Sequence, residues 1–132
     1  MISHLCLGTN HLPRAIRFYE AVLVHLGLLL KFSSLEQGMA AWVSPAASRP
    51  LLIVCLPFNE QAATAGNGQM VALLAPNRQA VRDAHAAALQ HGAQDEGAPG
   101  LRPHYHPHYY GAYFRDLDGN KICVCCHDPE AT

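Results

Sequence analysis

The chain has 132 residues, of which 50% are hydrophobic and 14% are charged, and its net charge is −1. This length and composition predict one compact globular domain with its own core, and they exclude an intrinsically disordered chain. The charged residues are scattered rather than grouped, so no basic stripe indicates a nucleic acid or an anionic membrane as a partner.

The start of the chain passes directly into a strand pattern and lacks the features of a signal peptide. The longest apolar run, near Ala21 to Leu30, is interrupted by His25 and Gly27 and is too short to span a bilayer. Cysteines number five, and three of them lie within four residues, which is not the pattern of a disulfide framework. We therefore expect reduced thiols and a cytoplasmic location.

The first half of the chain predicts one strand, one helix and three further strands. Ile2 to Gly8 alternates as a strand does and places His4 and Cys6 on one face. A helix follows with apolar residues at helical spacing, with Asn10 as its expected N-cap and Gly27 as its expected end. The three strands are predicted at Leu28–Phe32, Gly38–Val43 and Leu51–Leu56.

The second half repeats this order after a polar segment, Pro57–Gly68, which we interpret as a linker. A strand at Gln69–Leu74 places Met70 on one face, and a helix then begins at Asn77 and ends at Gly92. The segments that follow are a short edge strand at Ala93–Glu96 and a loop rich in Pro and His at Gly97–His108.

The last hairpin is the clearest local pattern in the chain. Ala112–Arg115 and Ile122–Cys126 read as strands, and the turn between them is Asp116–Asn120, where Asp side chains cap backbone N–H groups and Gly119 permits a positive φ. Period two divides the second strand, so Cys123 lies on the face opposite to the branched residues of the core.

The two helix-ending glycines lie 65 residues apart, which indicates an internal repeat. One module spans about residues 1–58 and the other about 68–127, within a single domain. Because the helix of each module covers only one face of its sheet, we expect an α+β fold in which two βαβββ modules form an open, curved mixed β-sheet barrel. The helices lie outside the barrel and a concave pocket lies inside.

Three segments carry a resemblance to a known family. They are SHLCLGTNHLPRAIRFYEAVL at the start, GNGQMVALLAPNRQAVRDAHAAALQHGA in the middle and LRPHYHPHYYGAYFRDLDGNKICVCCH at the end. With them the chain resembles the vicinal oxygen chelate superfamily of glyoxalases, bleomycin resistance proteins and dioxygenases. The resemblance implies a homodimer that binds a small organic molecule.

The resemblance also implies three inward-facing metal-ligand positions, which fall on His4, Met70 and Cys123. Two of these are not the imidazole or carboxylate that Fe²⁺, Mn²⁺ or Ni²⁺ prefers. We therefore expect no cofactor and a metal-free pocket. The alternative is a soft site for Cu(I) or a divalent metal, with His4 as its most credible ligand.

Further candidates for ligand contact lie near the end of the chain. His104, His106 and His108 alternate and would project to one side of an extended segment, either as a surface metal site or as part of a loop that closes the pocket. His106 and Tyr113 are the expected ligand contacts, beside His4, Met70 and Cys123. A reactive Cys123 would need a nearby cation, and buried free thiols acting as small hydrophobic groups are the alternative.

The expected function is that of a glyoxalase-like small-molecule-binding protein with a degenerate metal site. The alternative is a metal-dependent lyase, isomerase or dioxygenase of the same superfamily with a non-standard ligand set. A drug-sequestering protein for a large cationic drug would call for a more acidic surface than a net charge of −1 provides.

Overall fold

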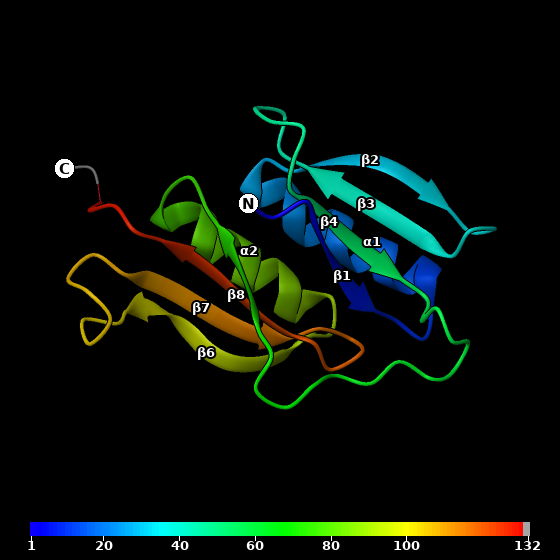
Figure 1. The fold of residues 1–132 in the computed structure, drawn as a ribbon. Coiled ribbons are helices and arrows are strands. Elements are labelled where there is room, and N and C mark those ends of the chain that lie inside the picture. The colour runs from blue at the N-terminus through cyan, green and yellow to red at the C-terminus, as the bar shows by residue number, and fades with distance from the viewer. Residues whose placement is uncertain (131–132) are drawn as a thin grey trace.

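The computed structural model describes residues 1–130, which form two modules of the same design (Figure 1). The first contains β1 (His4–Gly8), α1 (Leu12–Leu23), the short 3-10 helix η1 (Val24–Leu26), β2 (Leu29–Ser34), β3 (Met39–Val43) and β4 (Leu51–Cys55). The second contains β5 (Val71–Leu74), α2 (Arg78–Gln90), β6 (Gln94–Leu101), β7 (Tyr110–Arg115) and β8 (Lys121–Cys126). The predicted βαβββ repeat is confirmed.

Each module has its own four-stranded mixed sheet. The strand order is β1-β4-β3-β2 in the first and β5-β8-β7-β6 in the second. In both sheets the first and last strands of the module are parallel neighbours, and the other pairs are antiparallel. The predicted fold class is confirmed, in the form of two separate open sheets.

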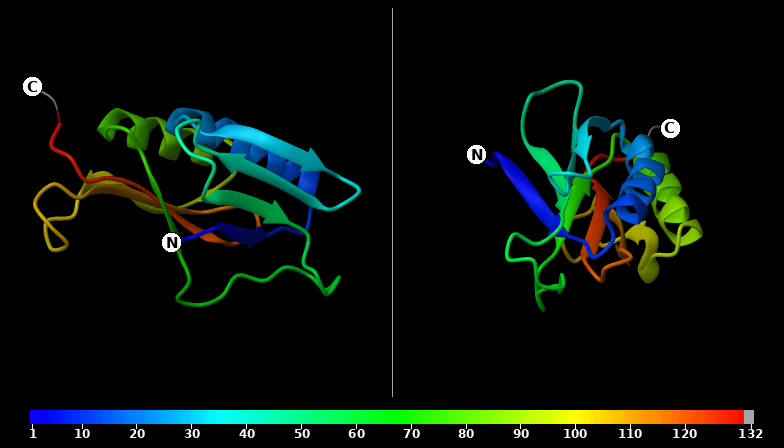
Figure 2. Two further views of the ribbon diagram at one scale, coloured as in Figure 1. Left: turned by 45° about the horizontal axis from the view of Figure 1, so that its top comes forward. Right: turned by 90° about the vertical axis from the view of Figure 1, so that its right-hand side faces the viewer.

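Both helices lie on the same side of the two sheets and pack against each other (Figure 2). One apolar core fills the space between helices and sheets, and it includes Val22, Trp42, Val81, Phe114 and Val124. The other face of each sheet is left without a helix, which is where a pocket can form. No helix within residues 1–130 is long and apolar enough to cross a membrane.

The start of α1 corrects one prediction. His11, not Asn10, is the N-cap, and its Nδ1 accepts a hydrogen bond from the Arg14 backbone N–H at 3.2 Å. The Asn10 side chain instead pairs with the backbone of Ala63 in the linker, at 2.7 Å and 3.2 Å. The expected end at Gly27 is present, with φ of 75° after the 3-10 turn.

The second module differs from prediction near its edge. β6 extends to Leu101, well past the expected end at Glu96, because an edge strand tolerates Pro99 and accommodates Gly97 and Gly100 at irregular register. The loop that remains, residues 102–109, is not extended. The prediction that His104, His106 and His108 project to one side required an extended segment. The loop folds into two turns closed by hydrogen bonds from the backbone N–H of Tyr105 and of Tyr109.

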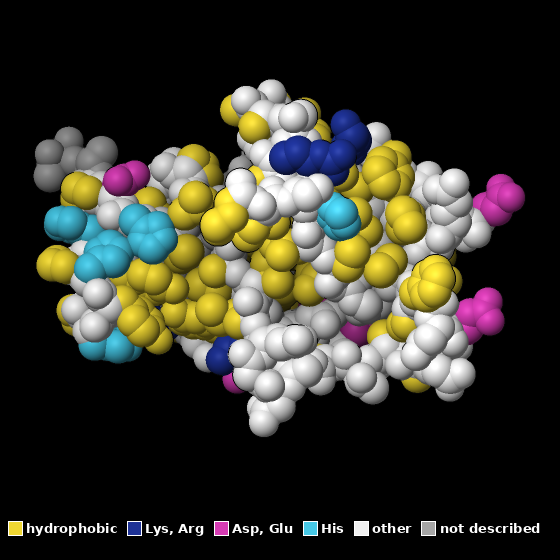
Figure 3. All heavy atoms as spheres, viewed as in Figure 1, with side chains coloured by type: hydrophobic (Ala, Val, Ile, Leu, Met, Phe, Trp, Pro, Cys, Tyr) yellow, Lys and Arg dark blue, Asp and Glu magenta, His cyan; other side chains and the backbone are white. Residues whose placement is uncertain are grey.

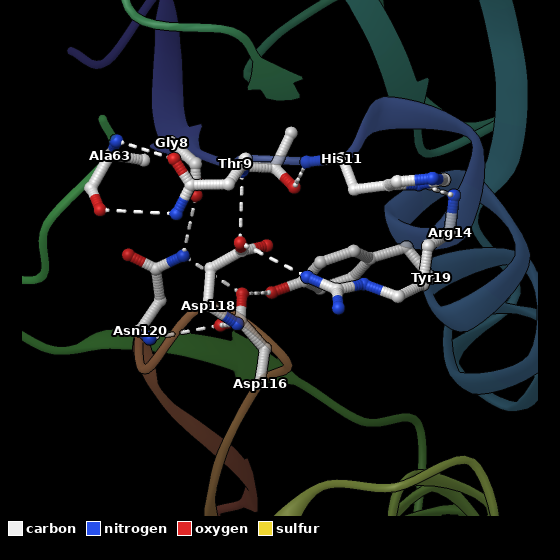
Figure 4. Close-up of polar contacts among 10 residues, drawn as sticks. Gly8, Thr9, His11, Arg14, Tyr19, Ala63, Asp116, Asp118 and Asn120 are labelled. Atoms are coloured by element: carbon white, nitrogen blue, oxygen red, sulfur yellow. Dashed lines mark hydrogen bonds and ion pairs between the residues drawn. The ribbon is translucent and has the colours of Figure 1, made fainter. Parts of the chain in front are cut away.

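The turn between β7 and β8 connects the two modules through Asp116 (Figure 4). Its Oδ1 accepts hydrogen bonds from the backbone N–H of Asp118 and Asn120, and its Oδ2 accepts from the Asn120 amide and from the Tyr19 hydroxyl on α1. Asn120 also donates to the Gly8 carbonyl at 2.9 Å. This turn of the second module is therefore held by α1 and β1 of the first.

Tyr19→Phe is expected to lower the free energy of unfolding by about 1.5 to 3 kcal/mol, because it removes a hydrogen bond to a buried carboxylate and leaves the rest of the ring in place. The measurement is urea denaturation followed by tryptophan fluorescence. Tyr105→Phe is the control, since Tyr105 is 62% exposed. Equal midpoints for the two variants would contradict the role given to Asp116.

Candidate functional site

A cavity of about 560 Å³ lies on the face of the second sheet that the helices leave open. Figure 3 views this side of the molecule, where hydrophobic side chains gather over both sheets and histidines cluster at one end. The cavity is lined by residues of the linker, the 102–109 loop, β7 and β8, namely Asn67, Gly68, Gln69, Met70, Tyr105, Tyr109, Tyr113, Arg115 and Lys121. Its walls are thus mainly aromatic and amide, with cationic groups among them.

Tyr109 crosses the floor of this cavity. Its hydroxyl lies 3.0 Å from the Tyr113 hydroxyl and 3.4 Å from Cys123 Sγ. The ring fits there because Gly111 has no side chain: a Cβ at that position would lie 2.8 Å from Tyr109 Cε1. Burial is the main cause that raises the pKa of Tyr109 well above its usual value, so the phenol stays protonated.

Two cationic side chains lie over the ring of Tyr113, and a third, Arg115, lines the same cavity. Lys121 Nζ lies 5.8 Å from the centre of its ring, and the guanidinium carbon of Arg102 lies 5.5 Å from it. Arg115 is already paired with Glu96 at 3.0 Å and with the Gly119 carbonyl at 3.1 Å. Lys121 lines the cavity and makes no ion pair with any residue from 1 to 130, whereas Arg102 donates to the Ala98 carbonyl at 2.9 Å and is not part of the lining. Lys121 is therefore the unpaired cation in the cavity wall.

A second cavity of about 490 Å³ adjoins the first and shares Gly68, Gln69, Met70 and Lys121 with it. Its far wall is the end of β1, where Cys6 and Gly8 line it. The two cavities form one cleft between the sheets, with the end of the linker along its rim.

The five predicted site residues differ in where they lie relative to the two cavities. Met70 lines both cavities, and Tyr113 lines the larger one and reaches Cys123 through Tyr109. His106 lies at the end of the cleft, where it contacts His127 rather than the cavity. His4 lies exposed at the start of β1, with Nδ1 2.9 Å from the Ser3 hydroxyl, and lines neither cavity.

The expected convergence of His4, Met70 and Cys123 is therefore not supported. The β1 residue that reaches the cleft is Cys6, two positions further along the same face as His4. Cys123 is fully buried beneath Tyr109 rather than open to the cavity.

The residues present do not fit the metal that the family resemblance implies. Thioether and thiol replace two of the three ligands, and the third, His4, lies outside the cleft. In the part of the chain that the structure describes, no group of three or more His, Cys, Asp or Glu side chains is arranged to hold a metal ion. The groups at this site that can bind or react are its phenols, thiols and cations.

The sequence did not assign Tyr105, Tyr109 or Lys121 as ligand contacts, although all three line the larger cavity. The only local signal for Tyr109 is the glycine two residues later, which leaves room for a ring on that face of β7. Lys121 begins β8 on the face of Cys123, but its approach to Tyr113 depends on the register of the β7–β8 pair.

Solved structures with the same fold come from several bacteria. A glyoxalase/bleomycin resistance protein from Albidiferax ferrireducens T118 is 33% identical over 97% of this chain and 99% of its own, with a TM-score of 0.85. A glyoxalase-related enzyme from Fulvimarina pelagi is 18% identical over 96% of this chain and 87% of its own, with a TM-score of 0.73. No curated protein matches the sequence.

The family comparison agrees with these structures and with the resemblance seen in the sequence. Residues 1–124 match the model of the Glyoxalase/Bleomycin resistance protein/Dioxygenase superfamily. This match covers nearly the whole chain, and the relative from Albidiferax ferrireducens is similar throughout its length. The chain therefore belongs to the Glyoxalase/Bleomycin resistance protein/Dioxygenase superfamily.

Proposed function

We propose that this protein binds a small organic anion with an aromatic or unsaturated body in the tyrosine-lined cavity, and that it does so without a bound metal. The observation that carries the proposal is that three phenol rings and one cation without a carboxylate partner line the same cavity. Tyr105, Tyr109 and Tyr113 offer flat apolar surfaces, and Lys121 offers a charge that no carboxylate of residues 1–130 neutralises. Such a mixture of aromatic walls and a few placed polar groups is typical of small-molecule sites.

The sign of the charge favours an anion over a cation. No Asp or Glu is among the described residues that line either cavity, whereas Lys121 lines both. A large cationic drug would gain from a carboxylate-lined cleft, so sequestration of such a drug is not supported. The backbone and amide groups of residues 67–69 at the rim can add hydrogen bonds to a carboxylate.

We also propose a homodimer formed through the open face of the first sheet. Leu29 and Phe32 project from β2 on the side away from the core, and they are 57% and 37% exposed. Val43 and Ile53 continue the same face on β3 and β4, half-buried. A second copy would remove this apolar area from water and would close the open side of the cleft. The free thiols of the described residues support a cytoplasmic location.

Lys121→Ala is expected to weaken binding of benzoate by about tenfold, because the lost charge-assisted contact is worth about 1.5 kcal/mol. The measurement is isothermal titration calorimetry. Lys31→Ala is the matched control, since Lys31 lies on β2 away from both cavities. Absence of saturable heat with the native protein, or equal affinities for the two variants, would contradict the proposal.

The purified protein is expected to hold less than about half an equivalent of any transition metal, because two of the three family ligands are absent. Elemental analysis by mass spectrometry after dialysis measures this. One equivalent per chain in the native protein, lost in His4→Ala, would instead support the metal-dependent alternative.

Phe32→Asp is expected to convert the dimer to a monomer, because it places a charge in the apolar interface. Sedimentation velocity measures the mass. Leu35→Asp is the control, since Leu35 is 66% exposed in the turn after β2 and lies off the proposed face. A native protein that sediments as a monomer would exclude the interface.

A further inference from the structure

Cys123 lies beneath the tyrosine-lined cavity, where one set of hydrogen bonds reaches its sulfur and a second reaches the sulfur of Cys125, two residues along the same face of β8. The first comes from β7. Tyr113 and Tyr109 contact each other through their hydroxyls, and Tyr109 reaches Cys123 Sγ at 3.4 Å. When Tyr113 donates to Tyr109, the single hydroxyl proton of Tyr109 is free to point at the sulfur. A thiolate at Cys123 therefore finds this donor already in place.

The second set runs through two histidines, and its direction follows from one backbone contact. The His108 backbone N–H donates to His106 Nδ1 at 3.2 Å, so the proton of the neutral His106 ring is on Nε2. This Nε2 lies 2.8 Å from His127 Nδ1 and donates to it. By the same reasoning the His127 proton is on Nε2, which faces Cys125 Sγ at 3.7 Å. The Cys125 sulfur accepts this bond, which leaves its own S–H free to donate.

The pKa values of both thiols, Cys123 and Cys125, are shifted. The hydrogen bond from Cys125 is the largest cause that lowers the pKa of Cys123 to about 7; Tyr109, Tyr113 and the charge of Arg102 also lower it, while burial opposes them. The pKa of Cys125 is raised, first by this same hydrogen bond and then by burial, so Cys125 remains a thiol donor. A cysteine among donors and cations has the surroundings of a reactive thiolate.

Access to this sulfur is controlled by one ring. The Cys123 side chain has no exposed surface, and it lines neither cavity. Tyr109, which does line the larger cavity, lies against Gly111 and contacts the sulfur. Its ring belongs to the end of the 102–109 loop, and a small molecule in the larger cavity would reach the sulfur only after this ring moves aside.

We infer that Cys123 is a nucleophile that forms a covalent adduct with small α,β-unsaturated carbonyl compounds admitted by Tyr109. In this step a sulfur electron pair forms a C–S bond to the β-carbon, and the π pair of the C=C bond moves to the carbonyl oxygen. The enolate then takes up at its α-carbon, by way of solvent, the proton that Cys123 released. Lys121, which lines this cavity, supplies a cation for the carbonyl oxygen. The inference rests on the proposed function, because it gives the same cavity a reacting group.

Acrylamide is the probe, because it is a small uncharged member of this class. Folded native protein is treated over a series of pH values, and each cysteine is quantified by peptide mass spectrometry. The expected adduct is on Cys123, with a rate midpoint near pH 7, about 1.5 pH units below that of free cysteine, whose pKa is about 8.5. The neighbouring Cys126 is an internal control: it is equally buried but faces the core, and it should stay unmodified.

Two variants separate a reactive site from an ordinary buried thiol. Tyr109→Phe keeps the ring and removes a donor, so the midpoint of Cys123 should move up toward that of free cysteine. Tyr110→Phe, on the other face of β7, should leave it unchanged. The inference is overturned if Cys123 reacts only after denaturation in urea, or if its native midpoint equals that of free cysteine. Benzoate binding that persists without an adduct overturns this inference alone, and an adduct without benzoate binding overturns only the proposed function.

Discussion

The carboxylate of Asp116 is the constraint on which the arrangement of the molecule depends. It is 7% exposed and accepts four hydrogen bonds, three from its own turn and one from Tyr19 on the helix of the other module. A buried charge is tolerated only when its lone pairs are satisfied in this way. The requirement fixes the turn against α1 and thereby fixes how the second sheet stands beside the first. The hydrogen bond between Tyr19 and Asp116 therefore also helps to set the width of the cleft between the sheets.

Much of the fold could be predicted because the signals are local. Asn77 caps α2 and Gly27 and Gly92 adopt positive φ near the ends of the helical segments, as expected from the sequence. Because these signals recur in both halves of the chain, the sequence predicts two modules with the same order of elements. Asn10 was assigned wrongly as a cap, because its side chain is taken by Ala63, which is distant in sequence and whose position only the folded linker determines.

The site was predictable only where strand alternation sufficed. Period two placed Cys123 on the face away from the core, and the family resemblance placed Met70 at the pocket; Cys123 lies outside the core cluster and Met70 lines both cavities. His4 was assigned from the family resemblance, and alternation could not correct this because Cys6, the residue that lines the cleft, shares its face. Tyr109 was missed because its position depends on two consecutive turns that bring the chain back over Gly111. Such a return is a property of tertiary structure rather than of any local pattern.

The segment between the modules is a wall as well as a connector. Residues 64–66 and 68–70 line the smaller cavity, and residues 67–70 line the larger one, while Asn10 anchors the same segment at Ala63. The helices and sheets do not need it for their packing. Insertions and deletions after position 63 can therefore reshape the cleft while the core stays intact. Proteins that share this fold can thus change their ligand specificity more readily than their fold.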